Sequence, residues 1–220
     1  MKMRLALFIF CISFVVESSA RTMKQFLMAM PDSVLPVLSL DNRLDAVDFL
    51  ESGMKATVQN NFGESSTLLR LSDDYASWEL STVVSCELKL LVSGADTTVC
   101  MSTTYHSPFP ESVLTFYNKD WQPRQCVVEW PTDADFRQIP EGYTLEDWKD
   151  LRNKAGMMVL QAKLQEKANE MVVYCHFPMA DETAKRDFPV LMKSSTTLFW
   201  HSSGFSKNNT EVGDYLFVLS

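Results

Sequence analysis

Residues 86–105, CELKLLVSGADTTVCMSTTY, decide the fold because they combine a two-residue period with a short polar turn. In the first part, Cys86, Leu88 and Leu90 alternate with two charged residues, which is the pattern of a strand with one buried face. The letters SGAD then supply turn residues, and a second β-rich run, TTVCMSTTY, follows at once. Two such runs with so short a connection predict an antiparallel hairpin.

The same period continues on both sides of this hairpin. Short runs of alternating residues are separated by clusters of Asn, Asp and Gly, and they lie at 55–60, 66–72, 76–82, 86–92, 97–105, 112–118, 124–130, 171–177, 196–202 and 214–220. Closely spaced strands with short turns indicate an antiparallel meander. We therefore predict the α+β class: a mostly antiparallel meander that can curl into a half-barrel, with two main helices packed against it.

The first predicted helix precedes the meander. Pro31 and Pro36 keep the chain from forming one helix before residue 40, Asp41 is a natural N-cap, and Gly53 suits the C-terminal stop. Its two faces are an apolar one with Leu44, Val47, Leu50 and Met54, and an acidic one with Asp41, Asp45 and Asp48. Arg43 is the exception, since it falls within the apolar sector.

The second predicted helix begins at Thr144, which forms a capping-box pattern with Asp147. Its apolar positions run on to Leu164, with a break expected between Asn153 and Gly156. The proline-bearing stretch 131–142 before it is the best subdomain boundary. We expect a signal peptide at 1–20, a helix plus antiparallel sheet at 21–130, and a helix plus strands at 131–220, the last two within one compact domain.

The first twenty residues have the layout of a secretory signal peptide. Lys2 and Arg4 precede an apolar run at residues 5–16, and small residues lead to Ala20 as the cleavage site. This run is shorter than the ~20 residues that span a bilayer, and no later segment is long and apolar enough to do so. We therefore predict a protein that is secreted across the inner membrane to the periplasm or outer envelope.

The charge balance argues against nucleic acid as a partner. The chain has 20 Lys and Arg against 28 Asp and Glu, a net charge of −8, and no cluster of basic residues. Phosphate backbones are bound through such clusters. Possible partners are instead an envelope protein, a lipid moiety or a glycan, and the oligomeric state stays open.

Four cysteines remain after the predicted cleavage: Cys86, Cys100, Cys126 and Cys175. An even number in a secreted chain allows two disulfides with three connectivities. Their spacing contains no CxxC pair for redox chemistry or zinc. The alternative is that some of them are buried thiols that act as small apolar side chains.

No strong catalytic motif occurs in the sequence, and we expect neither a metal nor a cofactor. Cys175 and His176 are adjacent, so in a regular strand they point to opposite faces and cannot form a catalytic pair. The three histidines are far apart in sequence, and a single histidine is more often structural than functional.

Four residues are candidates for a binding surface. Trp121 and the nearby Tyr117 lie in FYNKDWQP, a predicted turn whose tryptophan either anchors a partner or packs back on its own sheet. Asp32 lies outside the first helix and Arg43 points to its apolar side. We predict that Asp32 and Arg43 form an ion pair that holds the N-terminal segment against the helix.

Four segments in order resemble a family of secreted Bacteroidales proteins of unknown function: MPDSVLPVLSLDNRLDAVDFLESGMKATVQN (30–60), LSDDYASWELS (71–81), ELKLL (87–91) and SVLTFYNKDWQP (112–123). The first contains the motif MPDSxLPxLxxxNRLDxxDFxxSGMKA, and the resemblance spans residues 21 to 125. It implies a cell-envelope protein of a gut or oral anaerobe and brings no catalytic residues. It also makes disulfides less expected, because such bacteria often use few.

Two functions fit these features. The first is a non-enzymatic envelope protein that binds or carries a partner, which predicts an apolar concavity of several hundred cubic ångströms without titratable pairs. The second is a hydrolase of envelope or dietary polymer that uses carboxylates such as Asp32, Asp45 and Asp48. This second function predicts a cleft in which two carboxylates face each other with separated pKa values.

Overall fold

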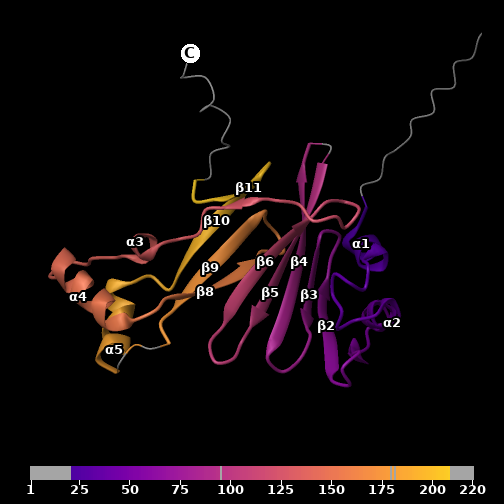
Figure 1. Cartoon of the computed structure of the whole chain (residues 1–220), viewed down its shortest axis with the longest axis horizontal. Coiled ribbons are helices and arrows are strands. Elements are labelled where there is room, and N and C mark those ends of the chain that lie inside the picture. The colour runs from indigo at the N-terminus through magenta and orange to yellow at the C-terminus, as the bar shows by residue number, and fades with distance from the viewer. Residues whose placement is uncertain (1–20, 95, 179, 181, 209–220) are drawn as a thin grey trace, which may run out of the picture.

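The computed structural model of the 220-residue chain describes residues 21–94, 96–178, 180 and 182–208. The predicted signal peptide at 1–20 and the predicted strand at 214–220 lie outside the described residues. The molecule is elongated, with a six-stranded sheet towards one end and a five-stranded sheet beside it (Figure 1).

The six-stranded sheet is the predicted meander. Its strands are paired in chain order: β1 (Thr57–Gln59), β2 (Ser65–Leu71), β3 (Tyr75–Glu79), β4 (Val84–Ser93), β5 (Asp96–Tyr105) and β6 (Glu111–Tyr117). All of the pairs are antiparallel. The hairpin predicted at residues 86–105 is confirmed, because β4 and β5 pair from Val84↔Tyr105 to Ser93↔Asp96.

Two N-terminal helices cover one face of this sheet: α1 (Met23–Ala29) and α2 (Leu40–Glu51) (Figure 1). Their apolar residues join those of β2–β5 in one core, with Phe26, Leu38 and Trp78 among its most buried members. As predicted, Pro31 and Pro36 keep the chain from forming one helix before residue 40, but the sequence analysis did not find the separate helix α1. Helix α1 ends before Pro31, so the prolines do not interrupt it, and Thr22 and Gln25 form a capping box at its start.

Helix α2 starts earlier than predicted. Ser39 is the N-cap, and it forms a capping box with Asn42, whereas Asp41 lies in the first turn. Its buried residues are Arg43, Ala46 and Val47. The buried face of the helix is therefore centred closer to Arg43 than the predicted apolar face was. The predicted C-terminal end of α2 is confirmed, because Gly53 follows the C-cap Ser52 and has a φ of 72°.

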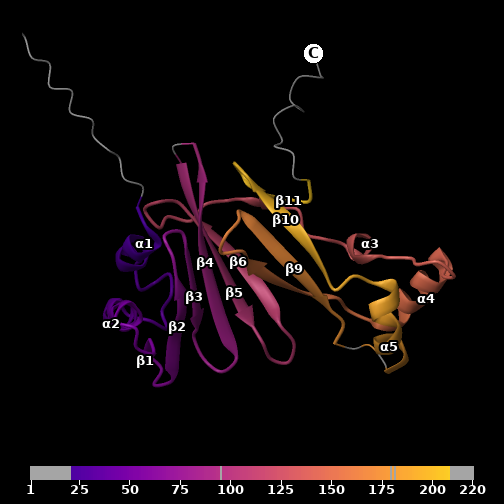
Figure 2. The same cartoon turned by 180° about the vertical axis from the view of Figure 1, so that it is seen from behind.

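The five-stranded sheet has the order β7-β11-β10-β9-β8. Its strands are β7 (Val127–Val128), β8 (Val159–Leu164), β9 (Glu170–His176), β10 (Ser195–His201) and β11 (Gly204–Ser206). Only β11 and β7 are parallel among the described pairs. The sheet curls as a half-barrel, which is seen best from behind (Figure 2), and the whole chain is of the α+β class with mostly antiparallel sheets.

Three helices accompany this second sheet: α3 (Asp133–Phe136), α4 (Leu145–Ala155) and α5 (Glu182–Leu191). Thr144 and Asp147 do form the predicted capping box of α4. The helix ends at Gly156, whose φ is 73°, and residues 159–164 form strand β8 instead of continuing it. Helix α4 packs against α5 at the far end of the molecule, not against the meander (Figure 1).

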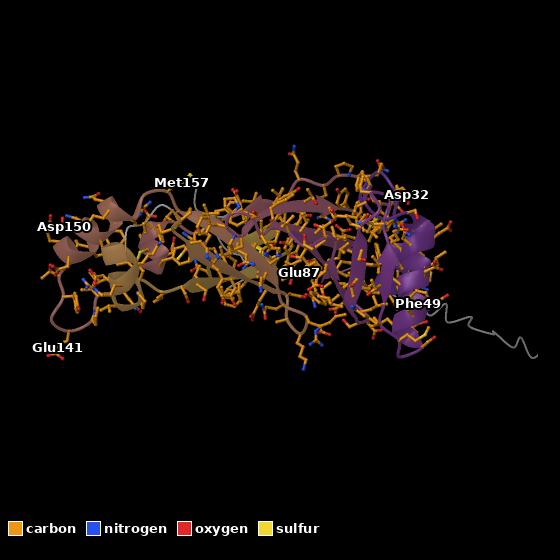
Figure 3. All side chains as sticks on the ribbon, turned by 90° about the horizontal axis from the view of Figure 1, so that it is seen from below. Asp32, Phe49, Glu87, Glu141, Asp150 and Met157 are labelled. Atoms are coloured by element: carbon orange, nitrogen blue, oxygen red, sulfur yellow. The ribbon has the colours of Figure 1, made fainter. Side chains whose placement is uncertain are left out.

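The two sheets meet through strand β8, the edge of the second sheet. On its outward side, backbone groups of Ala162 and Leu164 are bonded by side chains of the first sheet, which take the place of a neighbour strand there. Ala162 N donates to Ser112 Oγ (2.9 Å), and Ser102 Oγ donates to Ala162 O (2.9 Å). Leu164 N donates to the Glu87 carboxylate (2.9 Å). Glu87 thus lies midway along the molecule, as Figure 3 shows.

Candidate functional site

A largely apolar cavity of about 690 Å³ lies on the helix-covered face of the six-stranded sheet. We call it the β5–β6 groove. Its floor comes from alternate residues of two neighbouring strands, and its walls come from the segment before α2 and from two turns. The lining residues are Val34, Leu35, Pro36, Val37, Asn60, Phe62, Glu64, Leu80, Ser81, Val84, Met101, Thr103, Tyr105, Val113, Thr115 and Tyr117.

The floor exists because the helices cover the sheet unevenly. Val113, Thr115 and Tyr117 are two residues apart, so they share one face of β6. Val113 pairs with Thr103 and Tyr117 with Val99 on β5. The helices leave this part of β5 and β6 partly uncovered, so the side chains of Tyr105 and Val113 are 50% and 51% exposed. Two large apolar side chains are therefore presented to solvent on a rigid sheet.

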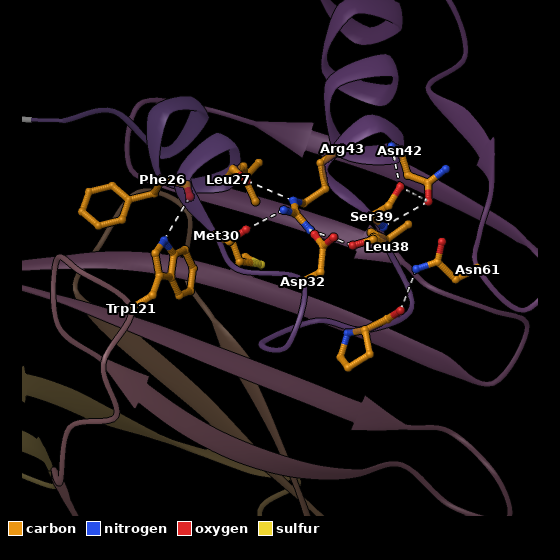
Figure 4. A network of polar contacts seen from close by, with 11 residues as sticks. Phe26, Leu27, Met30, Asp32, Leu38, Ser39, Asn42, Arg43, Asn61 and Trp121 are labelled. Atoms are coloured by element: carbon orange, nitrogen blue, oxygen red, sulfur yellow. Dashed lines mark hydrogen bonds and ion pairs between the residues drawn. The ribbon is translucent and has the colours of Figure 1, made fainter.

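One wall of the groove, residues 34–37, is held in place by Arg43. The Arg43 side chain is only 1% exposed, and its guanidinium donates to the carbonyl oxygens of Leu27 (3.0 Å), Met30 (2.5 Å) and Leu38 (2.6 Å) (Figure 4). It also pairs with Asp32 at 3.0 Å. The predicted ion pair is confirmed. The three carbonyls explain why this arginine lies on the buried face: it satisfies backbone groups at both ends of the wall.

Trp121 supports the groove from below the surface. It is 4% exposed, and its Nε1 donates to Phe26 O at 3.2 Å (Figure 4). Its ring lies 5.5 Å from that of Tyr117, centroid to centroid. Of the two turn aromatics, Trp121 therefore packs back on the core, whereas Tyr117 lines the groove.

The groove has little charge in its lining. The Asn60 amide is fully engaged, because it donates to Ser66 and Leu80 and accepts from Phe62 N and Glu64 N. Glu64 is the single charged residue among the described lining. The groove therefore has no second carboxylate to face the first one, which is the pair that a glycosidase needs.

The carboxylates expected of a hydrolase point elsewhere. Asp41, Asp45 and Asp48 lie on the exposed side of α2, and Asp32 is exposed beside Arg43. Solvent accounts for the acidic stripe. The hydrolase interpretation loses its main support from the sequence.

The four cysteines of the predicted mature chain are free thiols in the structure. Burial raises the pKa of Cys86 to about 12 and that of Cys175 to about 11. Burial likewise raises the pKa values of Cys100 and Cys126. A nucleophilic cysteine needs its thiolate, so these thiols are unsuited to that role.

Cys175 and His176 border a second cavity, of about 670 Å³, beside α5. Cys175 Sγ donates to Lys193 O (3.4 Å), and the His176 ring contacts the Gln161 amide (3.3 Å). Both side chains thus bond to other groups. A third cavity, of about 990 Å³, lies along the β10–β11 hairpin and the end of β4, and its lining includes Val92, Glu129, Asn169, Trp200 and His201. Neither cavity combines the apolar floor and rigid walls of the β5–β6 groove.

Within the described residues, no His, Cys, Asp and Glu side chains gather in a group suited to hold a metal ion. Of the helices in that same part of the chain, none has the length and apolar character needed to cross a membrane.

Sequence reasoning found Tyr117 and the Arg43 anchor but missed the groove floor. A signal for it was present in β6, ESVLTFY, where Val113 and Tyr117 are apolar on one face and Leu114 and Phe116 on the other. A strand with two apolar faces at the edge of a meander needs a cover on each face, and here one cover is incomplete.

Comparison with known proteins gives a family and a fold. A family model described as "Protein of unknown function (DUF3256)" matches residues 15–205. A solved structure, of a domain of an uncharacterized protein from Porphyromonas gingivalis W83, is similar with a TM-score of 0.70 at 19% identity, covering 87% of this chain and 100% of that chain. At that identity the likeness shows the fold alone. No curated protein matches the sequence.

Proposed function

The chain belongs to the DUF3256 family, whose function is unknown, and on that premise we propose that it is a non-enzymatic binding or carrier protein that holds an apolar partner in the β5–β6 groove. One observation carries this proposal. The groove measures about 690 Å³, and its lining includes a single charged residue, Glu64. Ligand sites in proteins are mostly apolar hollows of about 300–1,000 Å³ with few polar groups.

The proposed place of action is the periplasm or outer envelope. It is supported by the basic, apolar and small-residue order of residues 1–20. N-terminal sequencing of the exported protein should then begin at Arg21. An intact N-terminus in a cytoplasmic fraction would contradict this part of the proposal. An envelope protein, a lipid moiety or a glycan attached to an apolar group are the partner classes that such a place offers.

The test compares two valines with nearly equal exposure. Val113 is 51% exposed on the groove floor, and Val92 is 53% exposed on β4 outside the groove. Changing either to Asp should lower the free energy of unfolding by a similar amount, about 1 kcal/mol, because both are half-exposed strand positions and Asp is a poor strand former. In Val113→Asp, however, a carboxylate would stand on the apolar floor and expel an apolar occupant.

The measurement is mass spectrometry of what co-purifies with the full chain from its native envelope. We expect an apolar species to accompany the wild type and Val92→Asp but not Val113→Asp. Equal recovery with all three proteins, or no occupant of the wild type, would refute the groove as the binding site.

A further inference from the structure

Strand β6 is the last strand of its sheet, and part of its outer edge is unpaired. Phe116 O accepts a hydrogen bond from Arg124 N (2.8 Å), which shows that the backbone groups of Phe116 point outward. Directions alternate along a strand, so those of Leu114 point outward too. Within residues 21–94, 96–178, 180 and 182–208, no backbone group bonds to Leu114 on this side.

This unpaired edge borders the groove. Val113 and Thr115, which flank Leu114 in sequence, direct their side chains into the groove. A strand added beside β6 would continue the same sheet, and every second side chain of it would lie on the groove side. Backbone hydrogen bonds would then supply affinity and the apolar floor would supply selectivity, as in other cases of strand addition.

The charges that line the groove favour a basic partner over an anionic one. Among its described lining residues none is Lys or Arg, and Glu64 is the only charged one. The whole chain has a net charge of −8. The carboxylate or phosphate head group of a lipid would therefore meet a like charge and no cation, which is unfavourable. A basic side chain is the complement of Glu64.

From these observations we propose that the occupant of the β5–β6 groove is an extended apolar segment of another polypeptide, added as a strand to β6, with a basic residue that pairs with Glu64. This inference rests on the proposed function, because it names the partner of the same groove. It differs from that function in excluding an acyl chain as the principal occupant.

Four fluorescent probes test it by polarisation with the purified full chain. The first is a peptide of alternating valine and threonine that ends in lysine, and the second has glutamate in place of the lysine. The third is the lysine peptide methylated on alternate backbone nitrogens, which removes the strand hydrogen bonds. The fourth is a long-chain fatty acid.

We expect the lysine peptide to bind wild type and Val92→Asp but not Val113→Asp. The glutamate peptide should bind about fivefold more weakly, as suits one exposed charge pair, and Glu64→Lys should reverse that preference. Backbone methylation should weaken binding about tenfold or more, because the hydrogen bonds to the Leu114 backbone are lost.

The outcomes distinguish a failure of the strand partner from a failure of the proposed function. Binding of the fatty acid but not the lysine peptide, lost in Val113→Asp, would overturn the strand partner and leave the groove as an apolar binding site. A methylated peptide that binds as well as its parent would also overturn strand addition. If no probe binds in a way that depends on Val113, both proposals are overturned.

Discussion

Arg43 shows how one charged residue can shape an apolar protein surface. Its guanidinium is buried, yet its carboxylate partner Asp32 is 58% exposed. An ion pair with one partner in water contributes little to stability, whereas buried carbonyls without partners are costly. The main role of Arg43 is therefore to bond the carbonyls of Leu27, Met30 and Leu38. The ion pair with Asp32 adds to this network at its surface.

Substitution at the two partners should separate these contributions. Arg43→Met keeps an apolar stem but leaves three carbonyls without a donor, and we expect it to lower the free energy of unfolding by about 2–4 kcal/mol. Asp32→Asn should cost less than about 1 kcal/mol. Chemical denaturation of both variants measures the difference. Equal losses would mean that the ion pair, not the carbonyl network, dominates.

At the scale of the element, the start of α2 depends on a side-chain bond that composition does not reveal. Ser39 and Asp41 both suit an N-cap, but Ser39 Oγ accepts from Asn42 N (3.2 Å), and Asn42 Oδ1 accepts from Ser39 N (3.1 Å). The cap sets where the chain turns from the groove wall into the helix. An N-cap residue satisfies backbone donors that the helix itself leaves free.

Substitutions at the two candidate caps should lower the stability of the protein by different amounts. Ser39→Ala should destabilise the protein by about 1 kcal/mol through loss of the capping box. Asp41→Ala should lower the free energy of unfolding by only roughly 0.3 kcal/mol, because it removes a carboxylate that interacts favourably with the helix dipole in the first turn. Thermal unfolding of the two variants decides between them. A larger effect at Asp41 would show that the cap is misplaced.

The sequence predicted helices and strands well where a segment followed one hydrophobic period. It predicted them less well where a segment fits both the helical period and the strand period. The meander followed from strict alternation in runs such as residues 86–92. Residues 159–164, VLQAKL, were assigned to a helix because they continue the apolar positions of α4 beyond Gly156. A short apolar run fits either period, and only pairing with β9 settles it. Helix α1 was missed although Thr22 and Gln25 carry a capping box.

The complete groove was out of reach of the sequence, although β6 carried a signal for its floor. Its lining joins residues 34–37, 60–64, 80–84 and 101–117, which only the packing of α2 and two turns on the sheet brings together. Single residues with strong chemical constraints were accessible, because a charge on an apolar face requires a partner. An empty space between segments leaves no such mark on any one residue.

At the scale of the whole molecule, buried polar side chains join the two sheets. Glu87 accepts from Leu164 N of the second sheet (2.9 Å) and from the Tyr75 hydroxyl of the first (3.1 Å). Lys89 is 2% exposed, and it bonds to Asp74 Oδ2 and Glu166 O, each at 2.7 Å. Burial raises the pKa of the Glu87 carboxyl above its usual value. The contact between the sheets is therefore sensitive to protons.

The sign of this pH dependence follows from linkage. A raised pKa in the folded state means that the folded protein binds the proton more tightly than the unfolded chain. The resulting stability is present below the pKa of the unfolded chain and is lost as pH rises through the folded pKa. Glu87→Gln cannot ionise, so its stability relative to wild type should increase as pH rises from the ordinary pKa of a glutamate, about 4, through the raised pKa of the folded state. Denaturation of both proteins across this range tests it, and a constant difference would contradict it.

The covering of strand β8 also bears on how copies of the protein behave when they are crowded. A bare strand edge is a template on which other chains can pair and aggregate. On β8 the outward N–H groups of Ala162 and Leu164 already donate within the molecule. A neighbouring copy therefore cannot pair with the N–H groups of these two residues unless the two sheets first separate.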